Sequence, residues 1–136
     1  PSSPSVNLAR GTVLVVEDEP VVRTVAQALL SRSGYTVLTA PDGASALNIL
    51  RDHPVDIGLI LLDMTMPGCM GSEVFVRMRG MGLTTPVILM SGFSSRESMA
   101  HFEDEMPVCF LQKPFSVMQM KNALNLALES DSKRSV

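Results

Sequence analysis

Three carboxylates in this sequence directly follow runs of mainly apolar residues, where a charged side chain calls for a chemical reason. Asp63 follows the run 57–62, and Glu17 and Asp18 follow the run 12–16. If both runs are strands of a parallel sheet, their carboxyl ends meet at the edge where open α/β sheets bind ligands. Close carboxylates repel one another, and Mg²⁺, a hard cation that prefers oxygen ligands, relieves that repulsion. No cysteine or histidine stands at the spacing that Zn²⁺ requires.

A hydroxyl group and an ammonium group follow two later apolar runs. Ser91 follows the run 86–90, and Lys113 stands close after the run 108–111. An aspartate can act as a nucleophile on phosphorus, with a metal ion and a lysine neutralising the phosphoryl oxygens. Each of these residues alone is equally well explained by a solvated loop or a helix cap. Their joint placement at one sheet edge favours phosphoryl transfer to Asp63.

Strand and helix patterns alternate along the chain and predict the elements that position these groups. The predicted strands are 12–16, 35–39, 56–62, 86–90 and 108–111; the predicted helices are 20–33, a segment after Asp42, 71–81, 95–104 and 117–129. Five βα units predict an α/β fold of three layers, a flavodoxin-like doubly wound sheet with parallel strands in the order 2-1-3-4-5. Asp42 is expected to cap the second helix. The expected buried helix faces are Ala44, Leu47 and Leu50; Val74, Phe75 and Met78; and Leu124 and Leu128.

Length and composition predict one globular domain. The chain has 136 residues, of which 46% are hydrophobic, and a net charge of −3. An acidic balance disfavours direct binding of nucleic acid, and the absence of an apolar stretch of 18 residues disfavours a membrane contact. We expect a linker or tail over 1–10, a domain over 11–129 and a flexible C-terminal tail over 130–136. With two widely spaced cysteines and no signal peptide, a cytoplasmic location is expected.

Four segments carry a family resemblance: 13–19, 61–68, 86–92 and 110–115. Together, in this order and at these intervals, they resemble the receiver domain of bacterial two-component response regulators, and the likeness extends from 11 to 129. The resemblance implies that Asp63 accepts a phosphoryl group from a phosphohistidine on a histidine kinase or a histidine phosphotransfer protein. It further implies that the domain catalyses its own dephosphorylation but is otherwise not an independent enzyme.

The resemblance also assigns roles to the neighbouring residues. Asp63 and Asp18 would bind Mg²⁺ directly, Glu17 mostly through water, and the backbone carbonyl of Thr65 would be the third protein ligand. Lys113 would pair with the phosphate. The switch residues would be Ser91, turning toward the phosphoryl group, and Phe110, moving between outward and buried rotamers. Phosphorylation would change the face formed by the fourth helix, the fifth strand and the fifth helix, through which a homodimer is expected.

Four positions depart from the commonest pattern of the family. Glu17 and Phe110 replace the usual Asp and the frequent Tyr, Gly92 replaces a frequent Ala, and Met70 stands where Asp or Asn is common. These changes keep the phosphorylation chemistry and alter the details of switching. The segments 11–23 and 110–115 look most like receivers fused behind a histidine kinase, so we expect a C-terminal receiver of a hybrid sensor kinase. A separate regulator is the alternative context.

Two other functions fit part of the pattern. A Mg²⁺-dependent phosphohydrolase also uses an Asp nucleophile, but it commonly carries a second Asp two residues later, where this chain has Thr65. A receiver-like docking module without phosphorylation would not need Asp63, Asp18 and Lys113 together.

Overall fold

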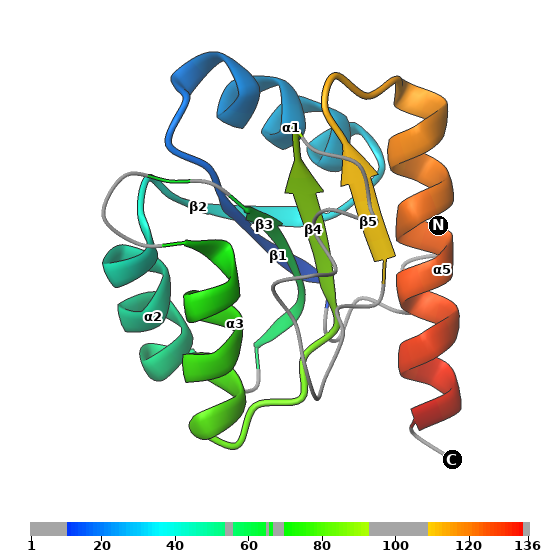
Figure 1. Ribbon diagram of the computed structural model, residues 1–136. Coiled ribbons are helices and arrows are strands. Elements are labelled where there is room, and N and C mark those ends of the chain that lie inside the picture. The colour runs from blue at the N-terminus through cyan, green and yellow to red at the C-terminus, as the bar shows by residue number, and fades with distance from the viewer. Residues whose placement is uncertain (1–10, 54–55, 65, 67–69, 93–108, 135–136) are drawn as a thin grey trace.

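The computed structural model describes residues 11–53, 56–64, 66, 70–92 and 109–134 (Figure 1). Within these residues, five parallel strands form one sheet in the order β2-β1-β3-β4-β5. The strands are β1 Thr12–Val16, β2 Thr36–Ala40, β3 Ile57–Asp63, β4 Val87–Ser91 and β5 Cys109–Gln112. The predicted fold class and strand order are confirmed.

Helices cover both faces of the sheet, because right-handed crossovers change face where the direction of the strand order reverses after β2. They are α1 Pro20–Arg32, α2 Gly43–Asp52, α3 Gly71–Gly80 and α5 Val117–Arg134. Helices α2 and α3 lie side by side on one face, and α1 and α5 lie on the other (Figure 1). The predicted helix 95–104 lies outside the described residues.

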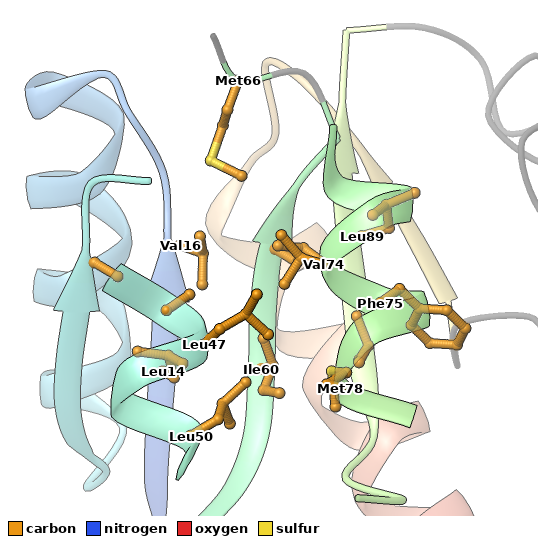
Figure 2. Close-up of a cluster of buried hydrophobic side chains, with 14 of the residues drawn as sticks. Leu14, Val16, Leu47, Leu50, Ile60, Met66, Val74, Phe75, Met78 and Leu89 are labelled. Atoms are coloured by element: carbon orange, nitrogen blue, oxygen red, sulfur yellow. The ribbon is translucent and has the colours of Figure 1, made fainter. Parts of the chain in front are cut away.

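Two apolar cores result, one on each face of the sheet. Along β1, Leu14 and Val16 point toward α2 and α3, whereas Val13 and Val15 point toward α1 and α5. This alternation follows from the two-residue period of a strand. Because both faces are covered, β3 is buried along its whole length, and its residues before Asp63 carry no polar side chain. Figure 2 shows the core under α2 and α3.

The strands that carry the polar groups end one residue later than their apolar runs predict. Asp63 pairs with Met90, and Ser91 pairs with Gln112, so both polar side chains belong to the sheet. Backbone pairing sets the end of a strand, whereas the apolar pattern reports only side-chain burial. Asp63 and Ser91 are consequently held by the sheet itself.

Helix α2 confirms one prediction and corrects another. The Asp42 side chain accepts a hydrogen bond of 2.7 Å from the backbone N–H of Ser45, as expected for an N-cap. Ala44, predicted to be buried, is exposed. Ala46 takes that place, because the capped start fixes the phase of the helix. The buried side chains of α2 are Ala46, Leu47 and Leu50.

Helices α3 and α5 follow their predicted faces as far as these are described, and α5 differs in length. Val74, Phe75 and Met78 of α3 are buried as predicted, and so is Leu124 of α5. Helix α5 continues to Arg134, into the segment predicted as a tail, because no Gly or Pro interrupts it. The predicted linker 1–10 and the side chain of Leu128 lie outside the described part of the structure.

Candidate functional site

The predicted polar residues meet at the carboxyl edge of the sheet. Asp63 is the last residue of β3 and is 1% exposed. Glu17 and Asp18 follow β1, which lies beside β3, and Ser91 ends β4 on the other side of β3. Lys113 follows β5, and its backbone N–H donates a 2.7 Å hydrogen bond to the Ser91 carbonyl. The structure therefore brings together the groups that the sequence analysis placed at separate strand ends.

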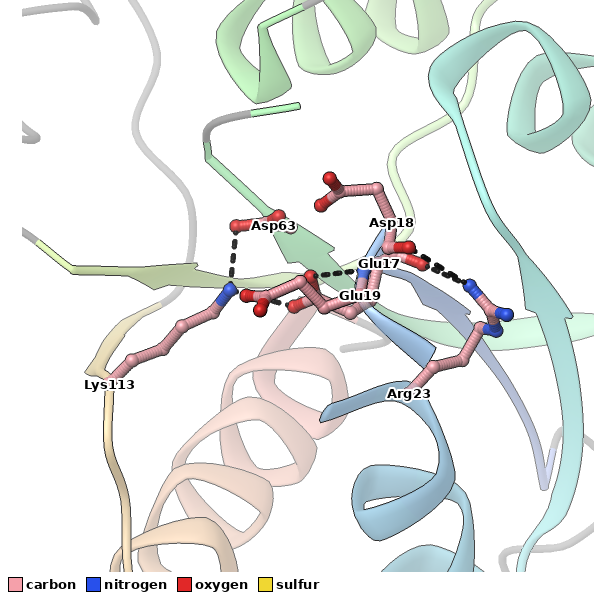
Figure 3. A network of polar contacts seen from close by, with 6 residues as sticks. All are labelled: Glu17, Asp18, Glu19, Arg23, Asp63 and Lys113. Atoms are coloured by element: carbon pink, nitrogen blue, oxygen red, sulfur yellow. Dashed lines mark hydrogen bonds and ion pairs between the residues drawn. The ribbon is translucent and has the colours of Figure 1, made fainter. Parts of the chain in front are cut away.

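Lys113 connects two of the carboxylates. Its Nζ lies 2.8 Å from Oε1 of Glu17 and 3.1 Å from Oδ1 of Asp63, to which it donates a hydrogen bond (Figure 3). Both carboxylates are buried, so the ammonium group supplies positive charge where water is largely excluded. Lys113 is thus placed to neutralise a further negative group that binds beside Asp63.

The acidic turn after β1 is held by backbone contacts on several sides. The backbone N–H of Glu17 donates to the Ala40 carbonyl of β2, and Oε2 of Glu17 accepts a hydrogen bond from the N–H of Glu19. Nη1 of Arg23 on α1 donates to the Glu17 carbonyl at 2.8 Å and reaches the Asp18 carbonyl at 3.5 Å (Figure 3). Arg23 therefore fixes the turn from the side away from the crevice.

The three carboxylates fit a divalent cation. One oxygen atom each of Glu17, Asp18 and Asp63 lies within 4.8 Å of the others. Oε1 of Glu17 is already paired with the Lys113 ammonium group at 2.8 Å, so Asp18 and Asp63 offer the less encumbered oxygens. An all-oxygen donor set suits Mg²⁺. The backbone carbonyl predicted for Thr65 lies outside the described residues.

Burial and charge strongly perturb the acidity of Asp63. Burial, followed by the charge of Glu17, raises the pKa of Asp63 from 3.8 to about 7, although Lys113 acts in the opposite direction. Burial also opposes the charge on Lys113, but its contacts with Glu17 and Asp63 outweigh that effect and raise the Lys113 pKa. The crevice thus contains more negative charge than the one ammonium group neutralises, which favours the binding of a cation.

The predicted switch residues occupy different environments. The Ser91 side chain is buried at the end of β4. Phe110 on β5 is half-buried and packs against the core under α2 and α3. Ser91 lies on β4, which neighbours β3, and Phe110 lies on β5, on the far side of β4.

The comparisons with known proteins agree with this arrangement. The family model of the response regulator receiver domain matches residues 13–125. The chain belongs to this family. As a receiver domain it is 36% identical over 118 residues to the sensor histidine kinase RcsC of Escherichia coli K12, a match that covers 86% of the chain. It is 32% identical over 120 residues to the transcriptional regulatory protein KdpE of Mycobacterium tuberculosis H37Rv, covering 88% of the chain.

A solved structure supports the same assignment. The crystal structure of the receiver domain from the hybrid histidine kinase CckA is 36% identical, with a TM-score of 0.74, and the match covers 87% of this chain and 99% of that one. The receiver spans 12% of the length of RcsC and 52% of the length of KdpE. Similar proteins therefore include hybrid sensor kinases and response regulators of two-component systems. No helix in the described part of this receiver is long and apolar enough to cross a membrane.

Two supporting residues could not be predicted from the sequence: Arg23, which lies within the segment 11–23, and Gly71, which begins the predicted helix 71–81. A buried backbone contact leaves no periodic signal, so only the folded structure shows that each touches the segments carrying the carboxylates. Among the residues predicted for the site, Thr65 is the one whose position is not described.

Proposed function

We propose that this receiver accepts a phosphoryl group on Asp63 from a phosphohistidine, in a reaction that requires Mg²⁺. One observation carries the proposal: the Lys113 ammonium group bridges the buried carboxylates of Asp63 and Glu17, beside the oxygens of Asp18. An ion pair that served stability alone would not need a third carboxylate in the same crevice. Three carboxylates and one lysine suit a cation and a phosphoryl group together.

The residues divide the work of the transfer. A carboxylate oxygen of Asp63 attacks phosphorus, the P–N bond of the phosphohistidine breaks, and its electron pair returns to the imidazole nitrogen. Mg²⁺, held by Asp63, Asp18, the Thr65 carbonyl and, through water, Glu17, would neutralise charge on the phosphoryl oxygens. Lys113 moves its hydrogen bond from the carboxylate to a phosphoryl oxygen. Arg23 keeps the acidic turn in place.

Switching follows from the added charge. The Ser91 hydroxyl donates a hydrogen bond to a phosphoryl oxygen, and Phe110 moves into a buried rotamer. These changes shift the population of domain molecules from one conformational state toward the other. The described part of the face that changes comprises β5 and α5; the fourth helix expected beside them lies outside the described residues. Met118 and Leu126 of α5 are 65% and 53% exposed, which supports a homodimer through this face.

A groove beside the site supports a protein as the phosphoryl donor. Its volume is about 370 Å³, and Lys113 belongs to its wall. It is lined by Glu19, Val21, Val22, Val25, Lys113, Pro114 and Phe115. Val21 is 75% exposed and Val25 is 47% exposed, so an apolar helix face from a histidine kinase or a histidine phosphotransfer protein would bury them.

We place the domain in the cytoplasm, at the C-terminus of a hybrid sensor kinase, with no direct contact to nucleic acid or membrane.

Phosphorylation with a small donor tests the proposal. The domain is incubated with acetyl phosphate and Mg²⁺, and the intact mass is measured, with beryllofluoride binding as a second readout. Wild type should gain one phosphoryl group, and Asp63→Asn and metal-free wild type should gain none. Asp42→Asn is the matched control, because Asn also caps a helix and Asp42 lies outside the site. Unmodified wild type, or modification of Asp63→Asn to the same extent, would refute the proposal.

A further inference from the structure

The first residue of α3 lies against the backbone that carries Asp63. Gly71 is buried, and a Cβ atom added to it would lie 2.5 Å from the carbonyl oxygen of Asp63. The same atom would lie 2.9 Å from Cα of Met64 and 3.2 Å from the carbonyl carbon of Asp63. All three neighbours are backbone atoms, so no rotation of a side chain can make room.

The backbone of Asp63 and Met64 cannot move away from Gly71 without losing hydrogen bonds. Asp63 pairs with Met90 in the sheet, and the N–H of Met64 donates a 2.7 Å bond to the Met90 carbonyl. On the opposite side, the N–H of Gly71 donates a 2.7 Å bond to the Met64 carbonyl. The segment that carries the carboxylate is therefore fixed between β4 and the first turn of α3.

We propose that Gly71 is a positioning residue for the phosphoryl acceptor, a role that rests on the proposed phosphorylation of Asp63. The absence of a side chain lets α3 begin in direct contact with the Asp63 peptide group. Ordinary contact with a Cβ atom begins at about 3.4 Å, so an alanine here separates the two by about 1 Å. A displacement of about 1 Å at a reacting group lowers a rate by as much as about 100-fold.

The other end of the same helix provides the control. A Cβ atom added to Gly80, the last residue of α3, has no neighbour within 4 Å. Gly80→Ala therefore makes the same chemical change in the same helix and leaves the Asp63 peptide group untouched. Any effect of added methyl groups on the helix alone appears in both variants.

The test compares Gly71→Ala and Gly80→Ala with wild type. We measure the phosphorylation rate with acetyl phosphate at saturating Mg²⁺, the Mg²⁺ affinity by calorimetry, and the ¹⁹F spectrum of the beryllofluoride adduct. Gly71→Ala should react about 10- to 100-fold more slowly, with shifted or missing ¹⁹F resonances. Its Mg²⁺ affinity should fall by less than its rate, because Asp63 is displaced but Glu17 and Asp18, which follow β1, stay in place. Gly80→Ala should match wild type in all three measurements.

A purely structural role for Gly71 predicts a different result. Rates are therefore expressed per folded molecule, and Gly71→Ala is also assayed with trimethylamine N-oxide, which favours the folded state. The inference would be overturned if the rate of Gly71→Ala recovers fully in the osmolyte or equals that of Gly80→Ala. It would also be overturned if Gly71→Ala never folds and loses its rate for that reason. Failure of wild type itself to react would instead overturn the proposed function.

Discussion

Asp63→Asn should stabilise the metal-free domain at pH 8, although it removes the proposed phosphoryl acceptor. Burial and the charge of Glu17 raise the pKa of Asp63 from 3.8 to about 7 in the folded state. The folded domain therefore binds this proton more tightly than the unfolded chain does. The contribution of Asp63 to stability is fully present below pH 3.8 and is lost as the pH rises through about 7.

The size of the effect follows from the difference in pKa. A rise from 3.8 to about 7 corresponds to about 4 kcal/mol at most. Asp18 and Lys113 beside Asp63 remain partly exposed, so water screens part of the repulsion. We therefore expect Asp63→Asn to be about 2 kcal/mol more stable than wild type at pH 8. Asparagine retains a side-chain oxygen that can accept the Lys113 hydrogen bond.

Urea unfolding followed by circular dichroism measures this difference, since the chain has no Trp. Both proteins are unfolded in EDTA at pH 5 and pH 8, and groups that titrate alike in both cancel from the comparison. The advantage of Asp63→Asn should grow between the two pH values. Added Mg²⁺ should then stabilise wild type more than the variant, because it binds the folded carboxylates. An advantage that is absent at pH 8, or that does not grow with pH, would refute the electrostatic argument.

Three further substitutions test separate contacts. Lys113→Ala should destabilise the metal-free domain by about 3 kcal/mol, because two buried carboxylates lose their shared cation; an unchanged urea midpoint would contradict this. Val21→Glu should slow transfer from a phosphohistidine protein about 10-fold more than transfer from acetyl phosphate, because it charges the groove. Val76→Glu, at a position on α3 that is 65% exposed, is its control, and equal effects of the two would argue against docking at the groove. Asp42→Ala should lower stability by about 1 kcal/mol in thermal unfolding, whereas Asp42→Asn should retain the cap; equal losses would count against the hydrogen bond to Ser45.

The sequence predicted which polar residues meet at the carboxyl edge of the sheet, because apolar runs locate the strands and chain order limits how the strands can be arranged. The apolar runs before Asp63 and Ser91 specify strands covered on both faces, and right-handed connections then leave few topologies. The runs could not show that both residues are themselves paired in the sheet. Hydrophobicity describes the side chain, whereas the end of a strand depends on the backbone of its neighbour. Ala44 was misplaced for a related reason, since alanine contributes too little hydrophobicity to fix the phase of a helix.

The roles within the acidic pair were harder to predict. The sequence offered Glu17 and Asp18 as similar groups, but Glu17 is fully buried and contacts Lys113, whereas Asp18 is half-buried. That difference depends on Lys113, which follows β5 and is far from Glu17 along the chain. Arg23 and Gly71 act on backbone atoms, for which no residue pattern exists. Long-range contacts and backbone contacts are thus the parts of the site that required a structure.

The strand order also has a consequence for biosynthesis. A ribosome exposes the carboxylates that follow β1 and the one that ends β3 long before it releases Lys113, and β5 can join the sheet only along β4. Until then, an emerging chain carries its buried acids without the ammonium group that neutralises them. Pairing between residues so distant in sequence forms slowly and late. Completion of the site around Asp63 therefore coincides with completion of the domain. Under the proposed function, a receiver truncated before β5 would lack Lys113 and would not compete with finished molecules for phosphoryl groups.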